Sequence, residues 1–189
     1  MSAIDNIKIR QIWIEEEADH WAKELGESSD TGFLYLASSL LLDCTPMDIE
    51  EEDIVDGGQD KQIDLIHIED NPEKGHADIM IIQAKSTGGA GGFSSNVVIQ
   101  IRTGLDWVFE RPKAELKGLK NRPFREKIDE IRALRTYYGA SNLTVKVYHI
   151  TNGDKSSLSS EYLEEAKTLR DKYGGVGFGS FYFRSVRSA

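Results

Sequence analysis

Two isoleucine-rich segments separated by a turn sequence constrain the fold of this chain more than any other feature. The segments span residues 62–68 and 78–85, and Asn71-Pro72-Glu73-Lys74-Gly75 lies between them. β-Branched residues favour strands, whereas Pro and Gly favour the turn between them. The sequence therefore predicts a β-hairpin with an exposed tip.

Helical periodicity is found on both sides of this hairpin. Apolar residues recur at helical spacing over 14–25, and 33–42 is apolar almost all round, which predicts a helix buried on most sides, capped by Asp30 or Thr31. After the hairpin we expect helices over 97–108, 124–138 and about 160–173, and strands over 143–150 and 181–183. This order predicts one α/β domain over residues 1–189, with a mixed central β-sheet flanked by helices on both faces. The Gly- and Ser-rich segment 86–95 is either a hinge or a plain connector.

Composition excludes several classes of protein. The longest apolar stretch, 33–42, is too short to span a bilayer, and no signal peptide opens the chain. The single cysteine, Cys44, cannot form an internal disulfide, which suits a reducing compartment. We therefore expect a cytoplasmic protein without a membrane partner. Its oligomeric state stays open, with a homodimer among the alternatives.

Charge is unevenly distributed along a chain whose net charge is -9. Acidic residues dominate the first third, whereas basic residues dominate 111–135. An acidic metal site beside a basic phosphate track would give this pattern, and a solvated helical face is the alternative. The basic residues that we expect to contact nucleic acid are Lys113, Lys117, Lys120, Arg122, Arg125 and Arg132.

Polar side chains interrupt the second isoleucine-rich strand. Gln83 and Lys85 must point to the same side of it, because side chains alternate along a strand, and Asp64 on the neighbouring strand is the natural partner of that cation. Phosphodiester cleavage needs a divalent ion held by oxygen atoms, an activated water and a positive group near the phosphorus. These three residues can supply those parts.

The arrangement resembles the PD-(D/E)xK nuclease motif in its QxK form, with Asp64 as the aspartate and Gln83-x-Lys85 as the second half. It is more similar still to the N-terminal nuclease-like domain of the abortive infection phage resistance (AIPR) family. In that family an Asp-x-x-Ile-Asp strand leads through a hairpin to an Ile-Ile-Gln-x-Lys strand, which here are 60–64 and 81–85. The likeness extends from 33–42 to the strand 143–150 and its Thr-Asn-Gly ending, so it covers most of the chain.

The resemblance implies a restriction-endonuclease-like fold and a divalent-metal-dependent nuclease of anti-phage defence (abortive infection), acting on DNA or RNA. The chain would then be the N-terminal part of a longer protein. The implied cofactor is Mg²⁺ or Mn²⁺, held by Asp64, Gln83 and the backbone carbonyl of Ala84, with Asp60 as a second-tier ligand. The implied catalytic residues are Asp64, Gln83 and Lys85, of which Lys85 positions or activates the attacking water.

Three alternatives to this interpretation stay open. Glutamine in place of the usual acid weakens divalent-ion binding, and 33–42 lacks the acid that many relatives carry, which leaves Glu17, Glu27, Asp30 or Asp43 as substitutes. The chain could then be a catalytically inactive module that binds nucleic acid or protein. Asp64, Gln83 and Lys85 could also form a buried ion pair that fixes strand register. Asp56 and Asp60 are also typical turn residues, and His67 and His149 are typical structural histidines.

Overall fold

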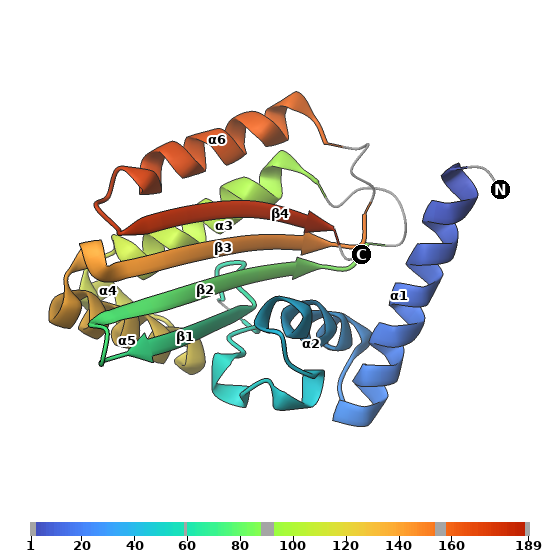
Figure 1. The fold of residues 1–189 in the computed structure, drawn as a ribbon, viewed down its shortest axis with the longest axis horizontal. Helices are drawn as coiled ribbons and strands as arrows, with labels where there is room; N and C mark the ends of the chain where they lie inside the picture. Colours follow the sequence, from blue (N-terminus) through green and yellow to red (C-terminus); the bar gives the residue numbers. More distant parts are fainter. Residues whose placement is uncertain (1–2, 59, 88–92, 154–157, 188–189) are drawn as a thin grey trace.

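A four-stranded mixed β-sheet forms the centre of the computed structural model, which describes residues 3–58, 60–87, 93–153 and 158–187. The strands are β1 (Leu65–Asn71), β2 (His76–Lys85), β3 (Leu143–Thr151) and β4 (Ser180–Arg187), in the spatial order β1-β2-β3-β4. β1 and β2 form the expected antiparallel hairpin, whereas β3 and β4 run parallel to β2 (Figure 1). The predicted mixed sheet is thereby confirmed.

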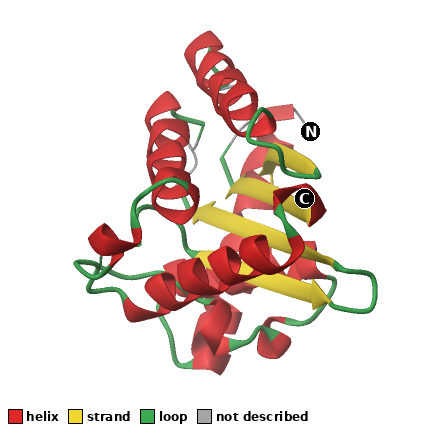
Figure 2. Ribbon diagram, turned by 90° about the vertical axis from the view of Figure 1, so that its left-hand side faces the viewer, coloured by secondary structure: helices red, strands yellow, loops and turns green. Residues whose placement is uncertain are grey.

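Helices cover both faces of this sheet (Figure 2). One face packs against α3 (Ser95–Phe109), α5 (Arg122–Tyr138) and α6 (Ser160–Gly174), and the short α4 (Lys113–Leu116) lies between α3 and α5 in the chain. The other face packs against α2 (Ser29–Leu42), which in turn packs against α1 (Ala3–Leu25). Three 3₁₀ turns complete the described elements: η1 (Pro46–Asp48), η2 (Glu51–Asp53) and η3 (Ala140–Asn142). Within the described ranges, no helix has both the length and the apolar character needed to cross a bilayer.

The sheet has a core on each side, and β2 contributes to both. Ile79 and Ile81 are buried against the α3, α5 and α6 layer, whereas Ile82 is buried against α2. A strand covered on both faces carries a nearly continuous apolar run rather than an alternating one. The isoleucine-rich sequence of β2 is the consequence, and its end is the place where polar groups begin.

The structure corrects two boundaries of the predicted elements. α2 begins at Ser29, and its N-cap is Ser28, whose side chain accepts a hydrogen bond from the backbone N–H of Thr31 at 3.3 Å. The prediction of Asp30 or Thr31 as the cap was therefore wrong, and Asp30 lies in the first turn instead. β1 begins at Leu65, because Lys61 and Gln62 have positive φ angles (59° and 62°) that no strand tolerates. Of the segment 86–95, residues 88–92 lie outside the described ranges.

The turn with these positive φ angles packs closely against α3 at Gly104. A Cβ atom at this position would lie 2.7 Å from the backbone oxygen of Lys61 and 2.7 Å from Cδ1 of Ile63. Both distances are shorter than a van der Waals contact, so glycine is what allows the turn to lie against the helix. The turn leads directly into Asp64, and its position therefore affects the candidate site.

We predict that Gly104→Ala lowers the free energy of unfolding by about 1–3 kcal/mol, because the added methyl group must displace backbone atoms of the turn. Gly174→Ala is the matched control, since a Cβ atom there meets nothing within 4 Å. Urea denaturation monitored by circular dichroism measures both changes. Equal stability of the two variants would contradict the close packing of the turn on α3.

Candidate active site

The segment between η2 and β1 carries acidic residues to the open end of the hairpin. The backbone N–H groups of Val55 and Asp56 both donate to the carbonyl oxygen of Asp64, at 2.9 and 3.0 Å, which closes the segment into a loop. The carboxylate of Asp60 organises the loop from within, because it accepts hydrogen bonds from the backbone N–H of Gln62 at 2.6 Å and of Gly57 at 3.2 Å. Asp60 is thus a turn residue, as the sequence suggested.

The Asp64 carboxylate is held by the end of β2. Its Oδ2 atom accepts one hydrogen bond from the backbone N–H of Ala84 at 2.7 Å and one from Nε2 of Gln83 at 2.8 Å. Gln83 Nε2 also donates to the carbonyl oxygen of Ala84 at 3.3 Å. The two side chains are almost fully buried, so these contacts fix their positions tightly.

These groups line a pocket of about 230 Å³ at the C-terminal end of β2. Every residue predicted for the catalytic and metal site lies on its wall, including Asp60, Asp64, Gln83, Ala84 and Lys85. The remaining lining residues come from the start of α2, from the acidic loop and from the end of β2: Asp30, Leu34, Asp56, Gln62 and Ser86. One strand, the loop that precedes β1 and one helix therefore converge on one pocket.

Asp30 and Asp56 are additional acidic residues of this pocket. Asp30 was one of four candidates for the acid that the helix lacks, and the structure selects it from that group, since Glu17, Glu27 and Asp43 do not line the pocket. Asp56 was interpreted only as a turn residue. Its distance of eight residues from Asp64 gave no periodic signal, because a loop rather than a strand or helix connects them.

Lys85 is exposed at the rim of the pocket. Within the described ranges it forms no ion pair shorter than 4.0 Å, with Asp64 or with any other carboxylate. The alternative of a buried ion pair that fixes strand register is therefore wrong. The ammonium group nevertheless faces the carboxylate closely enough to lower the pKa of Asp64, against the larger opposing effect of burial.

Burial and neighbouring acids make the pocket electrostatically unfavourable for anions. Desolvation is the main cause that raises the pKa of Asp64 to about 7, with further increases from Asp56 and Asp60. Desolvation followed by repulsion from Asp60 and Asp30 also raises the pKa of Asp56. Four carboxyl groups and a single ammonium group thus share this pocket, and a bound cation would relieve their repulsion.

The oxygen atoms of the pocket fit a hard divalent cation. Both hydrogen bonds to Asp64 end on Oδ2, which leaves Oδ1 for another ligand. Gln83 faces Asp64 with Nε2, so its buried and unpartnered Oε1 would reach the same cation only after the amide turns over. Mg²⁺ and Mn²⁺ prefer such carboxylate, amide and carbonyl oxygens. In the part of the chain that the structure describes, no three His, Cys, Asp or Glu side chains form a preassembled metal-binding group, so amide and backbone oxygens would have to complete the ligand set.

The six predicted nucleic-acid-binding residues divide into two groups. Arg132 donates to the carbonyl oxygens of Trp107 and Val108 at the end of α3, and Arg125 donates to the carbonyl oxygen of Leu119. These two arginines therefore bind backbone within the fold. The other four, Lys113, Lys117, Lys120 and Arg122, are exposed around α4 and the start of α5.

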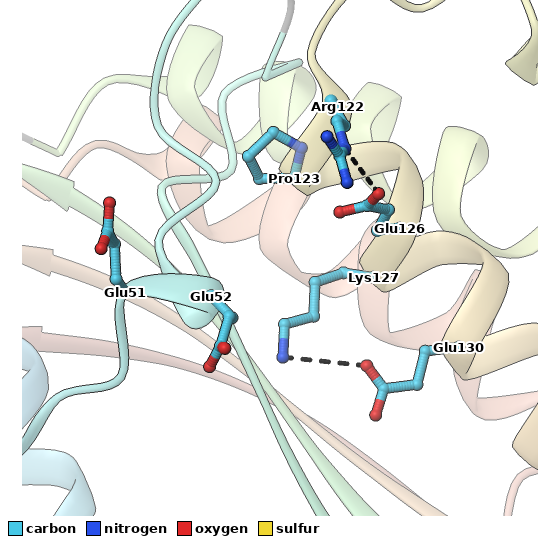
Figure 3. A pocket seen from close by; sticks show the side chains of 7 residues that line it. All are labelled: Glu51, Glu52, Arg122, Pro123, Glu126, Lys127 and Glu130. Atoms are coloured by element: carbon cyan, nitrogen blue, oxygen red, sulfur yellow. Dashed lines mark hydrogen bonds and ion pairs between the residues drawn. The ribbon is translucent and has the colours of Figure 1, made fainter.

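A larger cavity lies between η2 and the start of α5. It measures about 410 Å³ and is lined by η2 and α5 residues, among them Glu51, Glu52, Arg122 and Lys127 (Figure 3). Lys127 is bound to the buried Asp53 at 2.7 Å, and Arg122 is bound to Glu126 at 2.7 Å. Its lysine and its arginine are already paired with carboxylates, so we assign the chemistry to the smaller pocket.

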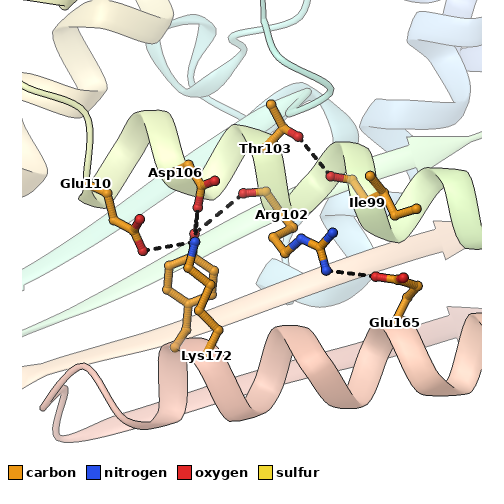
Figure 4. A network of polar contacts seen from close by, with 8 residues as sticks. Ile99, Arg102, Thr103, Asp106, Glu110, Glu165 and Lys172 are labelled. Atoms are coloured by element: carbon orange, nitrogen blue, oxygen red, sulfur yellow. Dashed lines mark hydrogen bonds and ion pairs between the residues drawn. The ribbon is translucent and has the colours of Figure 1, made fainter.

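A polar network between α3 and α6 is also structural (Figure 4). Asp106 accepts hydrogen bonds from Lys172 and from the hydroxyl of Tyr173, and Lys172 also contacts Glu110 at 3.1 Å. Arg102 is paired with Glu165 at 2.7 Å. The paired charges join the two helices across the surface of the core, and none of the buried unpartnered side-chain atoms found among the described residues belongs to this network.

Both strand histidines have structural partners, as the sequence suggested. His67 binds Asp53 at 2.6 Å, and this hydrogen bond raises its pKa. His149 is fully buried, and Nδ1 contacts the hydroxyl of Tyr162 at 2.8 Å. Desolvation lowers the pKa of His149 to about 4, so the ring is neutral at physiological pH.

Comparisons of the chain with protein families, with curated protein sequences and with solved structures found no match. The function must therefore be argued from the pocket itself.

We predict that Asp64→Asn stabilises the cation-free protein progressively as pH rises. A folded-state pKa raised to about 7 means that Asp64 costs no stability below about pH 4 and costs more as pH rises through neutrality. The asparagine oxygen can still accept both hydrogen bonds. The variant should gain about 2–4 kcal/mol over the wild type between pH 4 and pH 8, measured by urea denaturation in the presence of a chelator.

The exposed Asp19 on α1 provides the control for this experiment. The difference in the free energy of unfolding between Asp19→Asn and the wild type should stay constant across the same pH range. If the difference in the free energy of unfolding between Asp64→Asn and the wild type also stayed constant with pH, the Asp64 carboxylate would not be destabilised by its surroundings.

Proposed function

We propose that this chain is a divalent-metal-dependent nuclease domain of the PD-(D/E)xK type, with a restriction-endonuclease-like fold, that hydrolyses phosphodiester bonds of nucleic acids. The observation that carries the proposal is the convergence of Asp64, Gln83, Ala84 and Lys85 on one pocket. Those are the positions of the QxK form of the motif, with Asp64 directly before β1 and the other three residues at the end of β2. The similarity to the AIPR family extends the proposal to a role in phage defence by abortive infection.

The shape of the site supports a hydrolytic reaction. A pocket of about 230 Å³ has room for a hydrated ion and part of a phosphodiester, and its wall is mainly polar. Asp64 and Gln83 lie at the bottom of it, whereas Lys85 lies at the exposed rim. A substrate can therefore reach the ammonium group while the ligand oxygens stay sheltered from bulk water.

Each residue has a separate role in this proposal. Asp64 Oδ1, the Gln83 amide oxygen and the Ala84 carbonyl oxygen would hold Mg²⁺ or Mn²⁺, and Asp56 and Asp60 add negative charge nearby. The bound ion would supply Lewis acidity and lower the pKa of a water ligand. Lys85 brings its positive charge to the developing negative charge at phosphorus and orients the water. Asp60 acts chiefly by shaping the loop, because its two oxygens bind backbone N–H groups.

A catalytically inactive module that binds nucleic acid or protein is the second candidate. Two observations favour it: Gln83 presents its amide nitrogen rather than its oxygen to Asp64, and no three acidic or histidine side chains are preassembled among the described residues. Such a site binds a divalent ion more weakly than a Glu-x-Lys site does. A cleavage assay separates the two candidates.

We predict that the protein cleaves plasmid or single-stranded nucleic acid in Mg²⁺ or Mn²⁺, and that Lys85→Ala lowers the rate by about 100-fold or more. The substitution removes a charge at the transition state. It should leave the fold intact, since Lys85 is exposed. Gel assays with chelator controls measure the rates.

Lys74→Ala is the matched control, because Lys74 is exposed at the opposite end of the same strand pair. It should retain the wild-type rate. Equal traces of cleavage in wild type and Lys85→Ala would point to contamination and favour the inactive module.

We also predict that the basic residues differ in their effect on nucleic-acid binding. Lys117→Ala should weaken binding and reduce the salt dependence of the affinity by about one counterion. The reason is that the contact between the exposed Lys117 ammonium group and one phosphate of the nucleic acid is lost. Arg132→Gln should instead destabilise the fold, since it leaves carbonyl oxygens of α3 without their donor. Salt titrations by fluorescence anisotropy and thermal denaturation distinguish the two effects. An unchanged salt slope in Lys117→Ala would exclude this residue from the binding surface.

A further inference from the structure

Buried polar side-chain atoms without a hydrogen-bond partner lie near the C-terminal ends of β2 and β3. Four buried side-chain atoms of the described residues have no hydrogen-bond partner, and two of them belong to Gln83 (Oε1) and His149 (Nε2). A buried polar atom without a partner lowers the stability of the fold and therefore requires an explanation. Gln83 Oε1 can only accept a hydrogen bond, whereas His149 Nε2 can donate or accept one according to the tautomer of the ring.

Both residues belong to a polar row that crosses three strands at one register. Gln83 is the register partner of His149, which in turn is the register partner of Ser185 on β4. Their side chains project from the same face, and neighbouring strands lie about 4.8 Å apart. The hydroxyl of Tyr162 from α6 contacts His149 Nδ1 at 2.8 Å and Ser185 Oγ at 2.6 Å. Asp64 is joined to the other end of the row through Gln83 Nε2.

We propose that His149 sets the orientation of the Gln83 amide, and that a bound divalent cation reverses this orientation together with the tautomer of the His149 ring. The inference rests on the proposed function, because it assumes that the pocket binds a cation. His149 is thereby a positioning residue, acting on the candidate site through Gln83. It touches neither substrate nor cation.

Without a cation, the hydrogen bonds run in one direction along the row. Gln83 Nε2 donates to Asp64, so Oε1 points away from the pocket and requires a donor. His149 Nε2 is the other atom of the row without a partner, and as Nε2–H it would be that donor, through one bridging water or after a small side-chain rotation. Nδ1 then accepts from the Tyr162 hydroxyl, and Tyr162 accepts from the Ser185 hydroxyl.

A cation beside Asp64 requires the opposite direction. The Gln83 amide must turn so that Oε1 faces the ion, and Nε2 then points toward His149 and requires an acceptor. His149 Nε2 can accept only after it loses its proton while Nδ1 gains one, so the ring stays neutral. Nδ1–H then donates to Tyr162, and the Tyr162 hydroxyl donates to Ser185. With Gln83 and His149 joined in this way, every polar atom of the row would have a partner in both states.

Nitrogen-15 NMR of the ring of His149 tests the proposal, with Mg²⁺ as the probe because it is diamagnetic. We expect the proton on Nε2 in chelator and on Nδ1 at saturating Mg²⁺, seen as an exchange of the chemical shifts of the two ring nitrogens. Calorimetry on the same samples measures whether Mg²⁺ binds.

Gln83→Glu is the matched variant. A glutamate has only acceptor oxygens to offer once it is ionised, so His149 Nε2–H can remain its donor whether or not a cation is present. We expect this variant to bind Mg²⁺ at least about tenfold more tightly, because an acidic ligand replaces a neutral one. Its His149 proton should stay on Nε2 in chelator and in Mg²⁺.

Each other outcome overturns a defined part of the proposal. A proton on Nδ1 in the cation-free wild type would show that His149 does not orient Gln83. A proton that stays on Nε2 while calorimetry shows Mg²⁺ binding would overturn the coupling and leave the proposed nuclease function intact. Absence of Mg²⁺ binding by the wild type would contradict the proposed function and the coupling, whereas the cation-free tautomer would still decide the role of His149.

Discussion

The hydrogen bond from the backbone N–H of Ala84 to the Asp64 carboxylate is the contact on which the candidate site depends. β1 pairs with β2 only as far as Leu65 and Ile82, so beyond that point β2 has lost its backbone partner on one side. A buried N–H without an acceptor is expensive, and the Asp64 side chain supplies the acceptor that the strand no longer provides. The same bond places a carboxylate at the end of a central strand, beside Gln83, and thereby defines the floor of the pocket.

The buried position of the Asp64 carboxylate satisfies the N–H of Ala84, but it is electrostatically unfavourable. Asp64 is desolvated in a pocket that also receives Asp30, Asp56 and Asp60, and only Lys85 offsets them at the rim. A fold selected for stability alone would avoid such a group of acids, since each raises the cost of ionising the next. Clusters of this kind are typical of sites where a cation or a reaction repays the cost. The acidic loop is held in place all the same, because Val55 and Asp56 donate to Asp64 and Asn121 donates to the carbonyl oxygen of Val55 at 2.8 Å.

Periodicity was enough to predict the hairpin, the helices and the mixed sheet, because each of these depends on contacts local to the element or on its apolar face. The convergence of Asp64, Gln83 and Lys85 on one pocket followed from the alternation of side chains along β2. What the sequence could not reveal depends on tertiary contacts. The start of β1 was misplaced because the positive φ angles of the turn, supported by Gly104, are not encoded by its own residues. Asp30 reaches the pocket because α2 begins at Ser29, earlier than predicted, so that Asp30 lies in the first turn of the helix.

Charge counting along the chain was the least informative signal, because it cannot tell an exposed basic side chain from one bound inside the fold. Arg125 and Arg132 satisfy backbone carbonyls, so the basic surface around α4 and the start of α5 is smaller than the composition implies. Asn121, the N-cap of α5, nevertheless joins that surface to the acidic loop through Val55. A phosphate backbone bound by the remaining lysines would therefore lie against an element that is hydrogen-bonded directly to the loop carrying Asp56 and Asp60. The acidic and basic parts of the sequence are thus linked in the fold by the hydrogen bond between Asn121 and Val55.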